Sequence, residues 1–280
     1  MHEDISATNI IKILETPSIE QMRAAAEWLA NYDSTPDLQL ALYSLLKQQI
    51  IPQQRGGLLA IAYTESIVPN NIKGVMMIKP GNNLLIESSD YSATESLLAI
   101  AVRENCPHRV FTSALVKSWI RPLLLKHYSL QREYDQFVMI CTQPSIGGEG
   151  RWALPQDFEA LQAYAIAYST ERGSGSLNYD WDSLIKQRMI AVLENSGQIV
   201  SIVRYSATKR DAFIIAPFTF SKFRRQGFAQ KLLAFLIGEL LKEYSAVKLW
   251  VDEDNLPACA LYHSLGFQQV RHCYTGYFTS

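Results

Sequence analysis

The stretch Arg224-Arg225-Gln226-Gly227-Phe228-Ala229 stands between an apolar run at 211–220 and a long amphipathic segment at 226–243. The apolar run has the composition of a strand, and the amphipathic segment repeats leucine near helical spacing. The first amides of a helix lack backbone partners and carry partial positive charge. A strand that leads into a helix here therefore presents unpaired N–H groups, which are suited to bind a diphosphate.

The side chains of this stretch agree with an anion site. Gly227 has no Cβ to keep a phosphate away from the backbone, and Ala229 is nearly as small. Arg224 and Arg225 add full positive charge. The competing phosphate motifs, Gly-x-x-x-x-Gly-Lys and Gly-x-Gly-x-x-Gly after a strand, are absent from the sequence. Read alone, the pattern is more typical of an ordinary solvated start of a helix.

A second motif runs from Asn255 to Phe267. Asn255 is expected to cap a short helix that carries Tyr262, and Pro257 is tolerated in the first turn. Ala258 lies four residues before Tyr262 and so shares its face of the helix. Gly266 is expected to end the helix. Without the first motif, Tyr262 is more typical of a core residue than of a catalytic one.

Together the two motifs resemble the GNAT acetyltransferase superfamily, over about residues 150–280 and most specifically over 216–267. The family pattern Arg/Gln-x-x-Gly-x-Gly/Ala is similar to Arg224, Gly227 and Ala229. The family pattern Asn-x-x-Ala-x-x-x-Tyr, followed by Leu-Gly-Phe, is similar to Asn255, Ala258, Tyr262 and Leu265-Gly266-Phe267. The resemblance implies an α/β fold with a mixed, mostly antiparallel sheet flanked by helices.

The resemblance also implies acetyl-CoA as co-substrate and direct acetyl transfer to an amine acceptor, without a metal or a covalent intermediate. It implies Tyr262 as the acid that protonates the departing thiolate. Residues 216–220 are similar to the family strand whose backbone pairs with the pantetheine arm. The cofactor-binding residues implied in this way are Phe218, Thr219, Arg224, Arg225, Gln226, Gly227, Phe228, Ala229 and Asn255.

The general base is the part of the pattern that this sequence lacks, because 213–220 contains no carboxylate where many family members carry a Glu. Nearby alternatives are Asp252, Glu253, Asp254, His263 and His272. An ordered chain of water molecules is the preferred account. The missing Glu keeps open a CoA-binding regulatory module without chemistry, and a plain interaction scaffold is a third reading.

Domain organisation follows from composition. The clearest linker is 143–150, where Pro and Gly are concentrated. It predicts an N-terminal α/β domain at 1–142 and the acetyltransferase domain at 151–280. Both halves share an order of expected elements, which indicates a tandem chain with a degenerate first copy. The segment 90–94, where the first copy would hold its phosphate loop, has no Gly and no Arg, so no cofactor is assigned there.

The remaining elements follow from hydrophobic periodicity and turn residues. Helices are expected within 5–49 and at 92–104, 115–127, 156–169, 180–187, 226–243 and 256–265. Strands are expected at 58–63, 74–78, 84–87, 109–113, 134–141, 189–194, 198–206, 211–220 and 246–251, with two more after Gly266. Glu194-Asn195-Ser196-Gly197 predicts a hairpin. The loop 168–181, with Tyr168, Glu171, Arg172, Tyr179 and Trp181, would select the acceptor, and an ordinary surface loop is an equal alternative.

Composition narrows the function classes. The 280 residues are 48% hydrophobic and 19% charged, which is typical of a globular protein. Lys and Arg number 26 against 27 Asp and Glu, which argues against a nucleic-acid or membrane-surface binder. The N-terminus lacks a signal pattern, and no apolar run reaches the ~18 residues of a membrane span. Four scattered cysteines predict neither a disulfide framework nor a zinc site. We therefore expect a cytoplasmic, metal-free protein.

Overall fold

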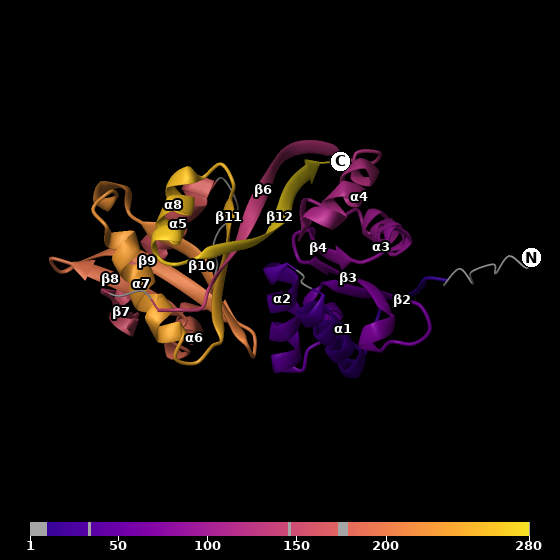
Figure 1. Ribbon diagram of the computed structural model, residues 1–280, viewed down its shortest axis with the longest axis horizontal. Coiled ribbons are helices and arrows are strands. Elements are labelled where there is room, and N and C mark those ends of the chain that lie inside the picture. The colour runs from indigo at the N-terminus through magenta and orange to yellow at the C-terminus, as the bar shows by residue number, and fades with distance from the viewer. Residues whose placement is uncertain (1–9, 33–34, 145–146, 173–178, 280) are drawn as a thin grey trace, which may run out of the picture. The chain divides into compact units, whose positions relative to one another are not determined.

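The computed structural model describes residues 10–32, 35–144, 147–172 and 179–279. The chain divides into two compact units. The first comprises residues 1–136 together with 272–280, and the second comprises 137–271. Among the described residues, no helix is both long and apolar enough to cross a membrane. Each unit is an α/β structure with its own strands and helices (Figure 1).

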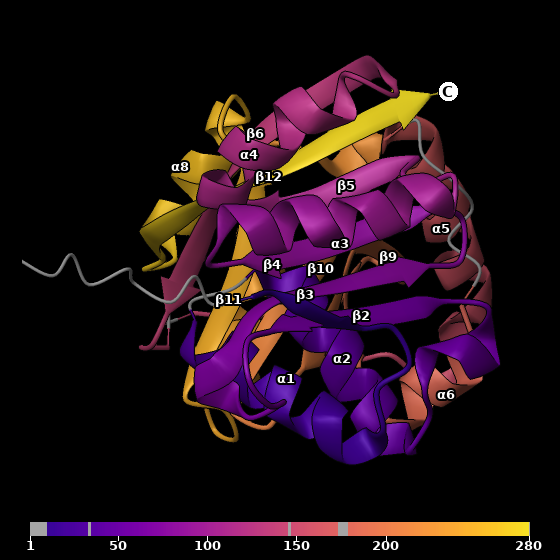
Figure 2. The ribbon, with the colours of Figure 1, turned by 90° about the vertical axis from the view of Figure 1, so that its right-hand side faces the viewer.

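The first unit contains helices α1 to α4 and strands β1 to β5, with the first part of β6. Its elements are β1 Lys12–Leu14, α1 Ile19–Asn31, α2 Pro36–Gln48, β2 Leu58–Tyr63, β3 Ile72–Lys79, β4 Asn83–Ser88, α3 Tyr91–Arg103, β5 Arg109–Ser113, α4 Ala114–Leu124 and β6 Ser129–Cys141. In Figure 2, α3 lies along the strands, and α1 and α2 lie together below them. The contacts agree, since α3 packs on β2 to β4, α1 on β3 and α2 on β4.

The second unit repeats this order. Its elements are β7 Arg151–Trp152, α5 Phe158–Arg172, α6 Trp181–Lys186, β8 Ile190–Asn195, β9 Gln198–Ala207, β10 Asp211–Thr219, α7 Phe228–Leu240, β11 Ala246–Asp252, α8 Leu256–Ser264 and β12 Gln268–Thr279. Short 3₁₀ turns at Pro155–Asp157 and Ser221–Phe223 precede α5 and α7. The hairpin expected at 194–197 is confirmed, because Asn195 pairs with Gln198 across Ser196 and Gly197, both at positive φ.

The pairing of strands is also repeated in the two units. In each unit three antiparallel strands, β2-β3-β4 or β8-β9-β10, lead to one parallel neighbour. The parallel pair β4–β5 starts at Asn83 and Arg109, and the parallel pair β10–β11 starts at Asp211 and Ala246. Both parallel ladders extend over three residues. The tandem arrangement expected from the order of elements is therefore present in the strand pairing.

The second unit has two apolar layers because successive strand residues face opposite sides of the sheet. One layer joins α7, α8 and the strands, with Leu232, Leu236, Leu249 and Tyr262 among its buried members. The other layer joins α5 and α6 to the same strands, with Tyr164, Trp181, Ile202 and Phe218. In Figure 1, α7 lies over β8 and β9, in agreement with its packing contacts.

Two strands belong partly to each unit. β6 begins in the first unit and ends in the second, whereas β12 begins in the second and ends in the first. The last part of β12 pairs antiparallel with β5, from Cys273 opposite Ser113 to Tyr277 opposite Arg109. Tyr274 Oη also donates to Glu133 Oε2 at 2.8 Å. The C-terminal residues therefore complete the sheet of the first unit.

Three sequence expectations differ from the structure. Residues 12–14 form β1 and not part of a helix, because they pair with β2 from Lys12 opposite Tyr63. One long strand, β12, replaces the two expected after Gly266. The helix expected from residue 226 begins at Phe228, because Arg225 and Gly227 have positive φ. These differences come from tertiary pairing or backbone geometry, which a local pattern does not contain.

The expected linker at 143–150 lies in part against α7. The amide of Glu149 donates to the Lys231 carbonyl at 3.1 Å, and its carboxylate pairs with Lys231 Nζ at 2.8 Å. Residues 145 and 146 lie outside the described residues. The division at 143–150 stays a prediction. Along the chain, the first compact unit gives way to the second between residues 136 and 137.

Asp157 fixes the start of α5 and is 6% exposed. Its carboxylate accepts from Arg151 Nη1 at 2.6 Å, from Arg151 Nη2 at 2.9 Å and from the Leu154 amide at 2.8 Å. Burial acts to raise its pKa, but these hydrogen bonds and the arginine charge outweigh burial and hold the pKa below its usual value. The carboxylate therefore stabilises the fold above the pKa of the unfolded state, and that stability is lost as pH falls through the folded pKa.

We expect Asp157→Asn to lower the free energy of unfolding at neutral pH by about 1–3 kcal/mol, because the arginine loses its charged partner. The difference from wild type should shrink in acid, where the wild-type carboxyl is protonated as well. Urea unfolding at pH 7 and pH 3 measures both quantities. A difference of equal size at both pH values would contradict the account.

Candidate functional site

The main candidate site begins where β10 and β11 separate. Their parallel pairing, among the described residues, covers Asp211–Phe213 opposite Ala246–Lys248 and goes no further. β10 continues to Thr219 and stays paired with β9 on its other side. The edge of β10 that faces β11 after Phe213 is therefore available to another backbone-like partner.

A bulge interrupts β10 directly after the separation. The register with β9 shifts between Ile215 and Phe218, and Ala216 has φ of 50°. A positive φ is unfavourable for alanine, so the surroundings must hold this conformation. Tyr164 of α5 contributes to that restraint, because its hydroxyl donates to the Ala216 carbonyl at 2.8 Å. Bulges of this kind re-aim backbone groups beside functional sites.

The N-terminus of α7 is open. Gly227 is its N-cap with φ of 82°, and no side chain caps the helix. A Cβ built on Gly227 would meet nothing within 4 Å. The first helical bond runs from the Lys231 amide to the Gly227 carbonyl at 3.1 Å, so the amides just before it have no helical partner. This geometry suits an anion such as a diphosphate.

The corresponding helix of the first unit, α3, is closed. Asp90 is its N-cap, and its carboxylate accepts from the Ala93 amide at 2.9 Å. The carboxylate takes the position that a bound anion would otherwise use at this helix end, and it would repel another anion. The two helix starts thus differ in chemistry although they occupy the same place in the repeated order.

The two arginines before α7 have different environments. Arg224 is tied to α5, because Nη2 lies 2.7 and 2.6 Å from the two carboxylate oxygens of Glu171. Its Nε also donates to the Thr219 carbonyl at 2.9 Å. Arg225 is exposed and has φ of 59°. Gln226 donates from Nε2 to the Lys222 carbonyl at 3.3 Å, which closes the turn.

The other expected cofactor residues flank this turn. Thr219 Oγ1 lies 2.9 Å from Ser201 Oγ on β9. Phe218 is 8% exposed and packs on Tyr164 with ring centroids 5.8 Å apart. Phe228 packs edge-on against Phe223, and Ala229 lies in the first turn of α7. The structure thus brings the end of β10, the turn and the start of α7 into one segment of the second unit.

The helix of the second motif forms as expected. Asn255 caps α8, with its side-chain oxygen accepting from the Ala258 amide at 3.3 Å. Tyr262 is 6% exposed, and its ring lies 5.8 Å from that of Phe267. It belongs to the same buried layer as Leu249 and Val251 of β11. The tyrosine is therefore held beside the strand that diverges from β10, and its catalytic role stays a prediction.

The alternative bases have other contacts. His263 Nδ1 lies 3.2 Å from the Phe267 carbonyl, which gives the ring a role at the end of α8. Asp252 ends β11, and the turn that follows it holds Glu253 and Asp254. The main-chain carbonyl of Asp252 accepts from the Asn255 amide at 3.0 Å.

The expected acceptor loop is described at both of its ends. Tyr168 and Glu171 lie on α5, and Trp181 begins α6, where it is buried. Tyr179 packs against Trp181 with ring centroids 5.3 Å apart. Residues 173–178 and the side chain of Arg172 lie outside the described part. Sequence reasoning missed Arg204 of β9, whose guanidinium carbon lies 3.7 Å from the centre of the Tyr179 ring. Only its placement inside an apolar strand could have drawn attention to it.

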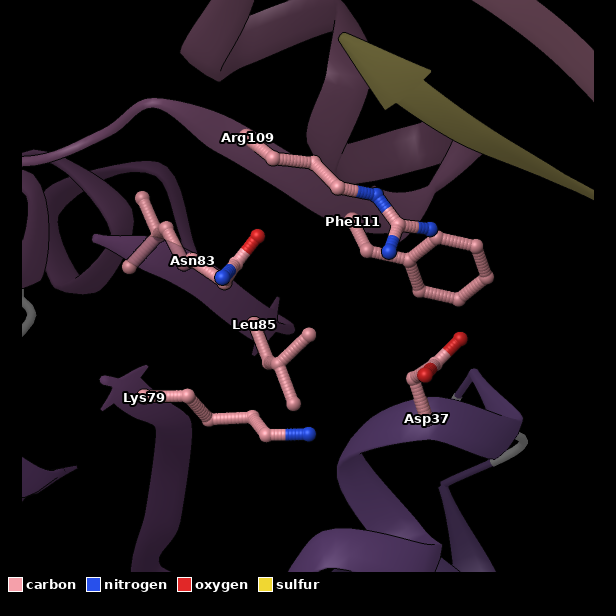
Figure 3. Close-up of a pocket in the computed structure, with 7 residues that line it drawn as sticks. Asp37, Lys79, Asn83, Leu85, Arg109 and Phe111 are labelled. Atoms are coloured by element: carbon pink, nitrogen blue, oxygen red, sulfur yellow. The ribbon is translucent and has the colours of Figure 1, made fainter. Parts of the chain in front are cut away.

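A separate pocket of about 120 Å³ lies in the first unit (Figure 3). Its lining residues are Asp37, Lys79, Asn83, Leu84, Leu85, Arg109 and Phe111. Burial raises the pKa of the Asp37 carboxyl, while the charges of Arg109 and Lys79 act in the opposite direction. The volume is well below the ~300–1,000 Å³ of typical ligand pockets, so a nucleotide-sized ligand does not fit.

Comparison with known proteins agrees with this geometry. Residues 156–267 match the model of the acetyltransferase (GNAT) family. No curated protein matches the sequence.

Several solved structures share the fold. A GCN5-related N-acetyltransferase from Sphaerobacter thermophilus has a TM-score of 0.64 and 17% identity, covering 95% of this chain and 94% of its own. A GNAT-family acetyltransferase from Colwellia psychrerythraea has a TM-score of 0.58 and 14% identity, covering 96% and 100%. A tandem GNAT protein from the clavulanic acid biosynthesis pathway has a TM-score of 0.57 and 11% identity, covering 95% and 98%. Residues 156–267 therefore match the acetyltransferase (GNAT) family, and the fold of the whole chain is similar to that of GNAT structures, one of which is a tandem protein.

Proposed function

We propose that this protein transfers an acetyl group from acetyl-CoA directly to a primary amine. The observation that carries the proposal is the open N-terminus of α7, with Gly227 at φ of 82° and no side-chain cap, directly after a strand that separates from its parallel neighbour. One segment thus offers an anion site and an unpaired strand edge. Acetyl-CoA has the matching parts, a diphosphate and an amide-containing pantetheine arm.

The diphosphate would accept hydrogen bonds from the first amides of α7, next to Gly227. The pantetheine amides would pair with the free edge of β10 near Phe218 and Thr219. Arg225 is exposed and available to the phosphates, whereas Arg224 is paired with Glu171. If Arg224 also bound the phosphates, its guanidinium would exchange the Glu171 carboxylate for a phosphate. Because both partners are more than one-third exposed, that exchange involves a small free energy.

The chemistry would proceed by attack of the neutral amine on the thioester carbonyl. Backbone N–H groups at the β10 bulge would stabilise the oxyanion that forms. Tyr262 would then donate its hydroxyl proton to the departing thiolate of CoA. A phenol with a pKa near ~10 and a thiol with a pKa near ~8.5 are matched closely enough for this transfer. An ordered water chain would carry away the proton lost by the amine.

One observation favours a second candidate, a CoA-binding module without catalysis. Residues 213–220 of β10 carry no carboxylate, so this strand lacks the general base of many relatives. The same open helix end would bind CoA in that case. Binding and turnover must therefore be measured separately.

Acetyl-CoA is expected to stabilise the chain against heat, because a ligand that binds the native state alone adds RT ln(1 + [L]/Kd), or about 2.7 kcal/mol at one hundred times Kd. Gly227→Glu should abolish this increase in Tm by placing a carboxylate at the phosphates. Gly227→Ala is the matched control, because it carries the same backbone strain without the charge. Absence of any increase for the wild-type protein would exclude both the transferase and the CoA-binding module.

Tyr262→Phe is expected to lower kcat by ~10²-fold or more, since general acids typically contribute 10²- to 10⁴-fold. The affinity for acetyl-CoA should stay within about twofold of wild type, because the ring keeps its packing against Phe267. Tyr205→Phe, at a tyrosine packed against the same apolar layer, is the control. Thiol release during acetyl transfer measures kcat. Unchanged turnover in Tyr262→Phe would assign the tyrosine a structural role.

A further inference from the structure

Arg204 is a buried cation on β9 of the second unit. Its side chain faces α5 and α6, and the residue is 7% exposed. Two of its nitrogens, Nε and Nη1, are buried without a hydrogen-bond partner. One face of the guanidinium is covered by Tyr179, whose ring centre lies 3.7 Å from Cζ. Most buried polar groups in proteins have hydrogen-bond partners, so these two unpaired donors require an explanation.

The charge of Arg204 is also uncompensated. Among the described residues, no carboxylate forms an ion pair with it. Removing a cation from water is unfavourable unless an anion or a full set of acceptors replaces the water. The side chain still affects its surroundings, because its charge opposes the rise that burial causes in the pKa of Tyr164. Within the part of the chain that the structure describes, Arg204 therefore has no anionic partner.

The place of Arg204 connects it with the β10 bulge. Arg204 pairs with Ile215, the residue directly before Ala216, so the two backbones are one strand spacing apart, about 4.8 Å. Tyr164, which holds the Ala216 carbonyl, belongs to the same α5–α6 layer. Partly buried aromatic residues of that layer surround the region, namely Tyr168, Tyr179 and Phe220. Arg204 thus belongs to the strand beside the backbone at which the acetyl group would be transferred.

We propose that Arg204 binds the carboxylate of the acceptor, so that the acceptor is an amino acid or a similarly compact amine that bears a carboxylate. This inference rests on the proposed acetyl transfer. The diphosphate of acetyl-CoA is assigned to the start of α7, and its 3′-phosphate lies at the nucleotide end, away from the thioester. We therefore assign the anion at Arg204, beside the β10 bulge, to the second substrate. A planar guanidinium stacked on an aromatic ring is well suited to a planar carboxylate. The aromatic neighbours favour an apolar side chain on the acceptor.

The first test compares acceptors that differ in the carboxylate alone. Each common L-amino acid is offered with acetyl-CoA beside the amine that lacks only its carboxylate, such as L-phenylalanine beside 2-phenylethylamine. Thiol release and detection of the N-acetyl product report turnover. We expect at least one amino acid to be acetylated with kcat/KM ~10- to 100-fold above its decarboxylated partner, as for a charged hydrogen bond in a buried site.

The second test uses the full-length variants Arg204→Met and Arg204→Lys. Arg204→Met should raise KM for the preferred amino acid by ~10- to 100-fold and leave the neutral amine unaffected. Its Tm without ligand should be equal to or higher than that of wild type, because an unpaired buried charge is removed. Arg204→Lys keeps the charge but not the planar guanidinium. It should keep part of the preference for the amino acid over the neutral amine that Arg204→Met loses. Arg210→Met, at an exposed arginine in the β9–β10 turn, should behave as wild type.

The outcomes separate this inference from the proposed function. If acetyl-CoA binds and neutral amines are acetylated as well as amino acids, the transferase stands and the role of Arg204 is refuted. If acetyl-CoA binds and no amino acid is acetylated, the role of Arg204 is refuted too. A fall in the Tm of Arg204→Met without a change in selectivity would make the arginine structural. Failure of acetyl-CoA to bind would refute the proposed function itself.

Discussion

The early end of the β10–β11 ladder is the constraint on which the site depends. Three parallel pairs hold the strands together, and beyond Phe213 each strand follows its own course. β10 then bulges at Ala216 and runs into the turn before α7, while β11 leads to α8 and Tyr262. Because the two strands separate, an open strand edge and an uncapped helix end follow each other along one segment of chain. A ladder continued to Thr219 would satisfy the same amides internally and remove the site.

The first unit has the same order of elements as the second unit but different residues at the start of the corresponding helix. It has a three-residue parallel ladder between β4 and β5, followed by a helix at the matching position. Asp90 caps that helix with its own carboxylate, whereas Gly227 leaves the corresponding end of α7 open. One side chain therefore separates a closed helix end from an open one. The first unit keeps a structural connection to the second through the strands β6 and β12, which belong partly to each.

Features that depend on neighbouring residues in the sequence could be predicted, whereas features that depend on tertiary contacts could not. The hairpin at Ser196-Gly197, the cap at Asn255 and the GNAT fold of the second half follow from turn residues, capping residues and motif spacing, and they are confirmed. The strand β1 was missed because three residues of an edge strand carry no period of their own. The pairing of Arg224 with Glu171 spans 53 positions, so no pattern near residue 224 indicates it. Arg204 was missed for a similar reason, since its burial depends on α5 and Tyr179.

Two groups of hydrogen-bond donors near the β10 bulge have no partner within the described part of the protein. One bound complex of acetyl-CoA and acceptor would satisfy both. The start of α7 presents amides without a capping side chain, and Arg204 presents buried donors without an anion. Each feature is unfavourable for the protein alone, and natural sequences retain such features where a ligand compensates them. In the proposed complex the diphosphate of acetyl-CoA would compensate the helix end, and the remaining phosphate of CoA lies at its nucleotide end, away from the acetyl group. The anion bound by Arg204 would therefore be the carboxylate of the acceptor. This contact would also hold the acceptor amine beside the thioester carbonyl. Binding energy at Arg204 would in this way position the amine for attack, which is how contacts away from the reacting atoms accelerate a transfer.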